Sequence, residues 1–95
     1  MKGTEKQIKW AEDIKSAMFA EIALMRKNRA HFDAMESVDC DLYPYTTACI
    51  DAVEEEVKAF WMRPELEDAS VVIRNRVMLE KAVKMSADKW MREHR

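Results

Sequence analysis

Apolar residues recur at steps of three and four from Thr4 to about Met35, and this spacing predicts a first α-helix. Thr4 and Gln7 have the form of a capping box, in which each side chain bonds the backbone N–H of the other residue at the helix start. The basic cluster at 26–29 interrupts the apolar pattern, and the helix either continues or bends there. The expected core-facing residues are Trp10, Ala11, Ile14, Met18, Ile22, Met25 and Phe32.

A second helix is expected over residues 44–62, after a loop at 36–43 that is rich in Ser and Asp and lacks helical periodicity. Pro44 suits the first turn of this helix, where its missing N–H is no loss. Arg63 precedes Pro64 and is therefore pushed out of the helical region, which ends the helix. Its expected core face consists of Cys49, Ile50, Val53, Val57, Phe60 and Trp61.

The segment from Pro64 to Arg95 predicts one long third helix, against which the other two pack. Arg76 and Glu80 fall inside its main apolar stripe, four residues apart, a spacing at which the two side chains can pair. The stripe itself consists of Ala69, Val72, Ile73, Leu79, Val83, Ala87, Trp90 and Met91.

A second apolar stripe, Val71, Met78 and Met85, repeats every seven residues nearly opposite the first. A three-helix monomer covers only one side of each helix. The second stripe therefore indicates a further contact, which is either self-association or a groove for a partner. Exposed apolar residues also occur on surfaces that bind nothing.

The composition favours helices throughout. The 95 residues include one Gly and two Pro, which leaves little turn chemistry for an all-β fold. We expect a single all-α domain over residues 1–95, a three-helix antiparallel bundle that can dimerise through the second stripe. Trp10, Trp61 and Trp90 are assigned to its core. The eight Met either fill that core or line an adaptable binding surface.

The net charge of −2 conceals three segments of different sign. Residues 1–30 carry seven Lys/Arg against four Asp/Glu, residues 31–68 carry two against eleven, and residues 69–95 carry seven against three. The acidic middle either balances the basic ends when the helices pack, or it presents an acidic face to a basic partner. The candidate residues for that acidic face are Asp39, Asp41, Glu54 and Glu55.

No catalytic motif is present, and we expect neither an enzyme nor a bound metal or cofactor. The single glycine excludes a Gly-rich phosphate loop. His31 with Asp33 and Glu36 is one histidine beside scattered carboxylates, which is weak support for a metal site. Cys40 lies between two aspartates, whose charges disfavour a thiolate nucleophile. No apolar run is long enough for a signal peptide or a membrane span, and the two unpatterned cysteines favour a cytoplasmic protein.

Nucleic-acid binding is less well supported than protein binding. Basic residues on the first and third helices are candidates for phosphate contacts, but the pI of 5.7 and the interspersed acidic residues are unlike a strong electrostatic footprint. The candidates are Lys6, Lys9, Arg26, Lys27, Arg29, Arg74, Lys81, Lys84, Lys89 and Arg92.

The opening GTEKQIKWAEDIK, residues 3–15, resembles a segment near the start of small proteins of bacteria and their phages. The resemblance implies an accessory protein of a phage or mobile element. Such proteins often act by binding, and some block host defence nucleases, as anti-CRISPR proteins do. Acidic side chains could then compete for a nuclease surface that normally holds phosphates.

We therefore expect a non-catalytic interaction protein with a protein partner, and an inhibitor of a nucleic-acid-handling host enzyme is one form of it. The alternative is a small nucleic-acid-binding or transcription-regulatory helical protein. The expected partner surface has an apolar side at Val71, Met78 and Met85 and an acidic side at the four residues given above.

Overall fold

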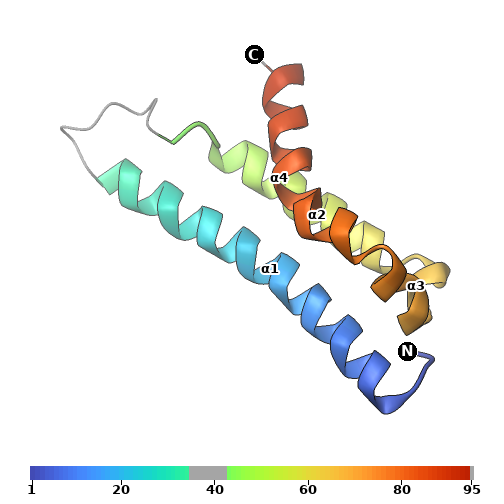
Figure 1. The fold of residues 1–95 in the computed structure, drawn as a ribbon. Helices are drawn as coiled ribbons and strands as arrows, with labels where there is room; N and C mark the ends of the chain where they lie inside the picture. Colours follow the sequence, from blue (N-terminus) through green and yellow to red (C-terminus); the bar gives the residue numbers. More distant parts are fainter. Residues whose placement is uncertain (35–42, 95) are drawn as a thin grey trace.

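The computed structural model describes residues 1–34 and 43–94, which form four α-helices and one short 3₁₀-helix (Figure 1). The expected all-α class is confirmed. A helix of 30 residues is about 45 Å long, so α1 accounts for most of the length of a molecule that measures 51 × 24 × 19 Å. The elements are α1 (Glu5–Ala34), α2 (Thr47–Trp61), η2 (Pro64–Glu67), α3 (Ala69–Arg74) and α4 (Arg76–Glu93).

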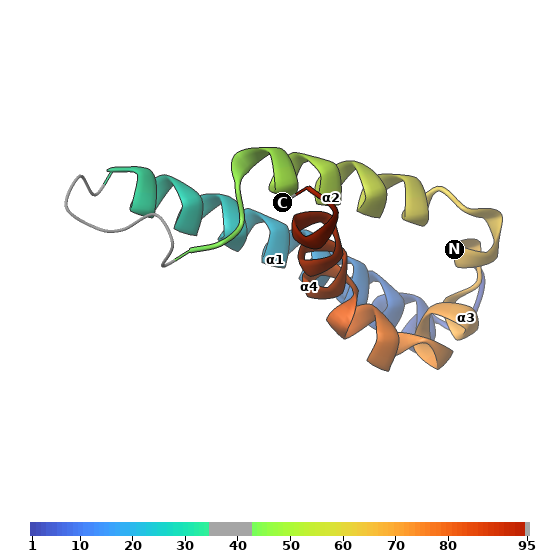
Figure 2. The ribbon, with the colours of Figure 1, turned by 90° about the horizontal axis from the view of Figure 1, so that it is seen from above.

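Helices α1 and α2 lie side by side and run in opposite directions, whereas α4 crosses them. Figure 2 looks nearly along α4 while α1 and α2 run across the view. α4 packs against both long helices, and α3 packs on the N-terminal half of α1. The core therefore lies where α4 crosses the pair formed by α1 and α2.

The N-terminus is tied to the start of α3. The capping box is confirmed: the Thr4 N–H donates to Gln7 Oε1 at 3.0 Å, and the Gln7 N–H donates to Thr4 Oγ1 at 3.2 Å. Just before it, Lys2 pairs with the chain around Asp68, and the Ala69 N–H donates to the Lys2 carbonyl at 2.8 Å. This main-chain bridge fixes where α3 begins relative to α1.

α1 continues through the basic cluster and ends at Ala34. Its buried residues are Ala11, Ile14, Met18, Ile22, Met25 and Arg29. The prediction that Trp10 belongs to the core is wrong, because 47% of its surface is exposed. Trp10 lies at the edge of the stripe, and Arg76 covers its ring, with the guanidinium carbon 5.2 Å from the ring centroid. Phe32 is half-buried.

α2 begins three residues later than expected. Thr46 is the N-cap: its hydroxyl accepts from the Cys49 N–H at 3.2 Å, so Pro44 lies outside the helix. A threonine hydroxyl satisfies one of the free N–H groups at a helix start, which a proline cannot do. The expected core face is confirmed for five of its residues, and Phe60 is half-buried.

The prediction of one helix from Pro64 to Arg95 is wrong, because the chain breaks twice. Asp68 has an extended backbone, and its carboxylate caps α3 by accepting from the Ser70 N–H at 3.0 Å. Asn75 separates α3 from α4, and its side-chain N–H donates to the Val71 carbonyl at 2.8 Å. Short polar side chains that bond nearby backbone groups compete with continuous helix, which gives both breaks a local cause.

Most of the main stripe on this segment is buried as expected. Ala69, Val72, Leu79, Val83 and Ala87 are in the core, and the rest of the stripe is half-buried. Arg76 and Glu80 are exposed instead of lying within it, and the Arg76 guanidinium donates to the Ile73 carbonyl at 2.9 Å.

Candidate functional site

A groove of about 520 Å³ runs along α4 on the side that faces α2. Its floor is apolar and comes from three helices, with Met18 from α1, Val57 from α2 and Leu79 from α4. Met78 and Met85 line the same groove from α4 and are 63% and 62% exposed. The groove therefore combines a buried apolar floor with two methionines that no other part of the described chain covers.

Hydrogen bonds between helices hold the two sides of this groove. The Ser86 hydroxyl donates to Glu56 Oε2 at 2.7 Å and joins α4 to α2. The Tyr45 hydroxyl, just before α2, donates to Asp88 Oδ1 at 2.6 Å. Burial, together with the hydrogen bond to Asp88, raises the pKa of Tyr45 to about 12. Each acidic residue along the groove therefore accepts a hydrogen bond from a neutral donor within the protein.

Of the three residues expected on the apolar side of the partner surface, two are exposed and one is not. Met78 and Met85 lie on α4 and are exposed, whereas Val71 lies on α3 and is half-buried against the core. The seven-residue repeat assumed an unbroken helix. Because the chain breaks at Asn75, Val71 belongs to a different helix and does not line the groove.

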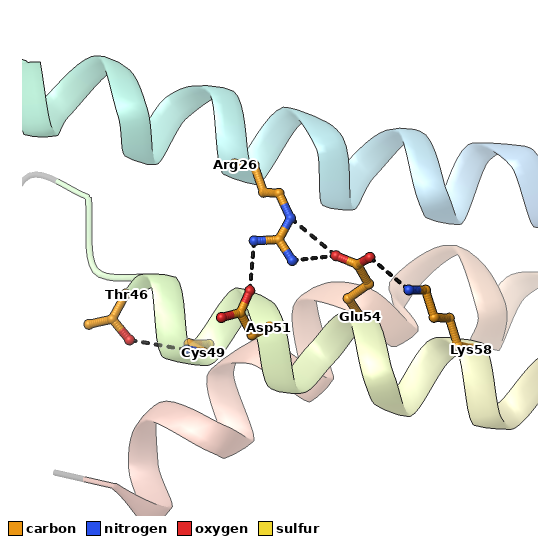
Figure 3. Close-up of polar contacts among 6 residues, drawn as sticks. All are labelled: Arg26, Thr46, Cys49, Asp51, Glu54 and Lys58. Carbon is orange, nitrogen blue, oxygen red and sulfur yellow. Dashed lines mark hydrogen bonds and ion pairs between the residues drawn. The ribbon is translucent and has the colours of Figure 1, made fainter.

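The expected acidic side is not assembled around the groove. Asp39 and Asp41 lie outside the described residues. Glu54 is held between helices: it accepts from Arg26 Nε at 3.1 Å and pairs with Lys58 Nζ at 3.1 Å (Figure 3). Hydrogen bonds from Arg26, then from Lys58, lower the pKa of Glu54. Glu55 is exposed on α2 and does not line the groove.

Two of the basic candidates for phosphate contacts, Arg26 and Arg29, bond residues outside their own helix. Figure 3 shows Arg26 reaching from α1 to Glu54 and Asp51 on α2, with its Nη1 at 2.8 Å from Asp51 Oδ1. Arg29 is buried, and its Nη1 donates to the carbonyls of Tyr43 and Tyr45 at 3.1 and 3.3 Å. Both guanidinium groups are already engaged within the protein, which makes them poor candidates for phosphate contacts.

The described residues contain no group of three His, Cys, Asp or Glu side chains that could hold a metal ion. Glu36, considered above as a metal ligand, and Cys40, considered as a nucleophile, lie outside those residues. Cys49 is a free, buried thiol, and its pKa is raised by that burial and then by Asp88. A protonated thiol inside the core is a packing residue and not a nucleophile.

Sequence reasoning missed a second groove, of about 260 Å³, on the other side of α4. It lies between α1 and α4 and includes Trp10, which was assigned to the core. The available signal was the seven-residue spacing of Trp10, Ala17 and Leu24, all of which are exposed on α1. This spacing was read only for the C-terminal segment.

Comparisons with protein families, with characterised proteins and with solved structures give no match to this chain. None of the described helices has both the length and the apolar character to cross a membrane.

Proposed function

We propose that the protein acts by non-covalent binding of another protein, and that the α2–α4 groove receives an amphipathic helix of that partner. The observation that carries this proposal is the exposure of Met78 and Met85 along an apolar groove whose floor is fully formed. Methionine is flexible and polarisable, which suits a surface that must adapt to an incoming side chain.

The dimensions and charges of the groove fit a helix. Met78 and Met85 are seven residues apart, so they are separated by about two turns, or roughly 10 Å, along α4. A helix lying in such a groove presents apolar residues at i, i+3, i+4 and i+7, which span the same distance. Lys89 and Arg92 line the C-terminal end of the groove and are exposed, so acidic residues on the partner would be favoured at that end.

The test is selection of binders from a library of helical peptides on the wild-type protein, followed by affinity measurements on two variants. Met78→Glu puts a charge on the groove, and Met62→Glu is the matched control because Met62 is 83% exposed beyond the end of α2. The selected amphipathic helices should bind the wild type and Met62→Glu equally. They should bind Met78→Glu at least about tenfold more weakly, since a carboxylate buried against an apolar partner loses its hydration.

Light scattering on the same three proteins distinguishes a partner helix from a second copy. A monomeric wild type supports the proposal. A dimer that becomes monomeric in Met78→Glu but not in Met62→Glu would show that a second copy fills the groove, which is the dimer expected from the second stripe. That result would overturn the partner-helix proposal, as would selected helices whose affinity does not change with Met78→Glu.

Inhibition of a nucleic-acid-handling host enzyme is a narrower form of the same proposal. The resemblance of residues 3–15 to proteins of bacteria and their phages supports it, and it implies a cytoplasmic partner in a bacterial host. In this form the protein binds its target in the absence of nucleic acid, and nucleic acid competes with the protein for the target. Binding that requires DNA or RNA, and that falls steeply with salt, would instead support the nucleic-acid-binding alternative.

A further inference from the structure

The groove between α1 and α4 is separate from the α2–α4 groove. Glu80 lines the first and Met78 the second, and two residues along a helix correspond to a rotation of about 200°. The grooves therefore open on nearly opposite sides of α4. They share only Met18 and Leu79, which lie beneath α4 where it rests on α1.

The α1–α4 groove has an apolar floor with a half-exposed tryptophan at one end. The floor consists of Ile14, Ala17, Met18 and Leu79, and the indole of Trp10 stands beside it. A tryptophan left this open is a typical anchor point of protein interfaces. At about 260 Å³ the groove is smaller than most pockets for small molecules, so it fits individual side chains of a larger partner.

The rim of this groove carries one sign of charge. Its only ionisable lining residues are Asp13, Glu21 and Glu80, and none of them takes part in an ion pair within residues 1–34 and 43–94. Asp13 and Glu21 are eight residues apart, which separates them by about 12 Å along α1. Charges spread over this distance cannot converge on one ion but can meet two separate cationic side chains.

We infer that the α1–α4 groove binds a basic amphipathic helix of a protein partner, with two cationic side chains about two turns apart and apolar residues between them. The apolar residues pack on Ala17 and Leu79, and the cations face Asp13 and Glu21. Arginine suits both parts, because its aliphatic stem packs on apolar surface while the guanidinium stays near carboxylates.

The Trp10 ring already accepts one guanidinium. Arg76 lies with its guanidinium carbon 5.2 Å from the ring centroid, a cation–π distance. Because Arg76 occupies this ring, a cation of the partner is attracted by the three carboxylates of the rim and not by Trp10. Nucleic acid, by contrast, is repelled by a rim of this charge.

The experiment uses a synthetic helical peptide that carries two arginines separated by two turns, with leucines between them, and a control peptide with glutamine in place of both arginines. Affinity is measured by fluorescence anisotropy at low salt. The protein variants are Asp13→Asn/Glu21→Gln/Glu80→Gln, which removes the charges, and Glu12→Gln, an exposed neighbour on α1 outside the groove. Circular dichroism confirms that each variant is folded.

The arginine peptide should bind the wild type and Glu12→Gln equally. It should bind the triple variant, which lacks the three rim carboxylates, about tenfold more weakly. The glutamine peptide should show a similar loss of affinity for the wild type. Equal affinity for the triple variant, or no binding at low salt, overturns the inference. A loss of affinity in Met78→Glu also overturns it, because the peptide would then lie in the α2–α4 groove, and the proposed function would still stand. Failure of the α2–α4 test leaves the present one unaffected.

Discussion

Arg26 and Arg29 stand three residues apart on α1 and make different kinds of contact. Arg26 is half-buried and joins α1 to α2 through two carboxylates. Arg29 is buried, pairs with Asp33 within α1 and also bonds the carbonyls of residues 43 and 45. The first contact is an ion-pair network that responds to pH and salt. The carbonyl contacts of Arg29 tie the segment before α2 to α1 through backbone acceptors.

The Arg26 network predicts that part of the stability of the protein depends on the charge of Glu54. Replacing Glu54 by Gln should lower the free energy of unfolding at pH 7 by about 0.5–1 kcal/mol, a value discounted for the partial exposure of the pair. The pKa of Glu54 is lowered in the folded protein. Its contribution is therefore complete above the unfolded-state pKa and is lost as the pH falls through the folded-state pKa. Urea unfolding at pH 7 and pH 3 measures the effect.

Glu55→Gln is the control for this prediction, because Glu55 neighbours Glu54 on α2, is exposed, and has no ion pair among the described residues. The wild type and Glu54→Gln should differ at pH 7, and the difference should be smaller at pH 3. If the two glutamine variants behave alike at both pH values, Glu54 does not clamp α1 to α2.

Burial of single residues was only partly predictable from the spacing of apolar positions. Ile14, Met18 and Ile22 follow the helical period and are buried as expected. Trp10 was expected in the core and is exposed, whereas Arg29 was a candidate for phosphate contacts at the surface and is buried. Which side chain is buried at the edge of a stripe depends on what crosses it, and neither the position of α4 nor the carbonyls that attract Arg29 can be read from the spacing alone.

At the scale of the elements, the main-chain bridge between Lys2 and the residues around Asp68 depends on the one glycine of the chain. Gly3 has a φ of +141°, a backbone angle that residues with a side chain rarely adopt. A Cβ placed on it would lie 3.1 Å from Ala69 Cβ and 3.0 Å from Gln7 Oε1. These neighbours belong to the start of α3 and to the capping box of α1. Gly3 thus allows the close approach that lets Lys2 pair with the chain before α3.

Gly3→Ala should therefore lower the free energy of unfolding by about 1–3 kcal/mol, from backbone strain and contact with Ala69. Lys2→Ala is the control, since it removes an exposed side chain and keeps the main-chain bridge. Chemical denaturation measures stability, and hydrogen exchange at the Ala69 amide reports whether the bridge opens. A Gly3→Ala protein as stable as Lys2→Ala would show that the conformation of Gly3 and the main-chain bridge beside it contribute nothing to the free energy of unfolding.

The start of α1 and its capping box were predictable because both depend on neighbouring residues, whereas the spacing left open whether α1 continues past Arg29. The breaks at Asp68 and Asn75 were not predicted, although each has a local hydrogen bond that favours it. Aspartate is a common N-cap residue. The helix start at Asp68 is also held by the main-chain pairing with Lys2, which is distant in sequence. The same limit applies to the candidate surface: Met78 and Met85 follow from α4 alone, whereas Val71 needed the break to be known.

At the scale of the whole molecule, α4 lies across α1 (Figure 2). A groove opens on each side of α4. Leu79 is buried at the crossing and lines both grooves. A protein of this size is stabilised by about 5–14 kcal/mol in total. The position of α4, and with it both candidate binding surfaces, therefore depends on a small number of packed side chains.

Leu79→Ala tests this arrangement. Truncating a buried leucine costs about 2–5 kcal/mol because apolar contacts are lost and a cavity remains, whereas Leu24→Ala, at an exposed position on α1, should change stability by about 0.5 kcal/mol or less. Under conditions where Leu79→Ala stays folded, its effect on binding should also differ from that of the other variants. Met78→Glu should weaken binding only at the α2–α4 groove. The triple variant that lacks the three rim carboxylates should weaken binding only at the α1–α4 groove. Leu79→Ala should weaken both, since it removes floor from each, and a loss confined to one groove would show that α4 does not set the shape of both.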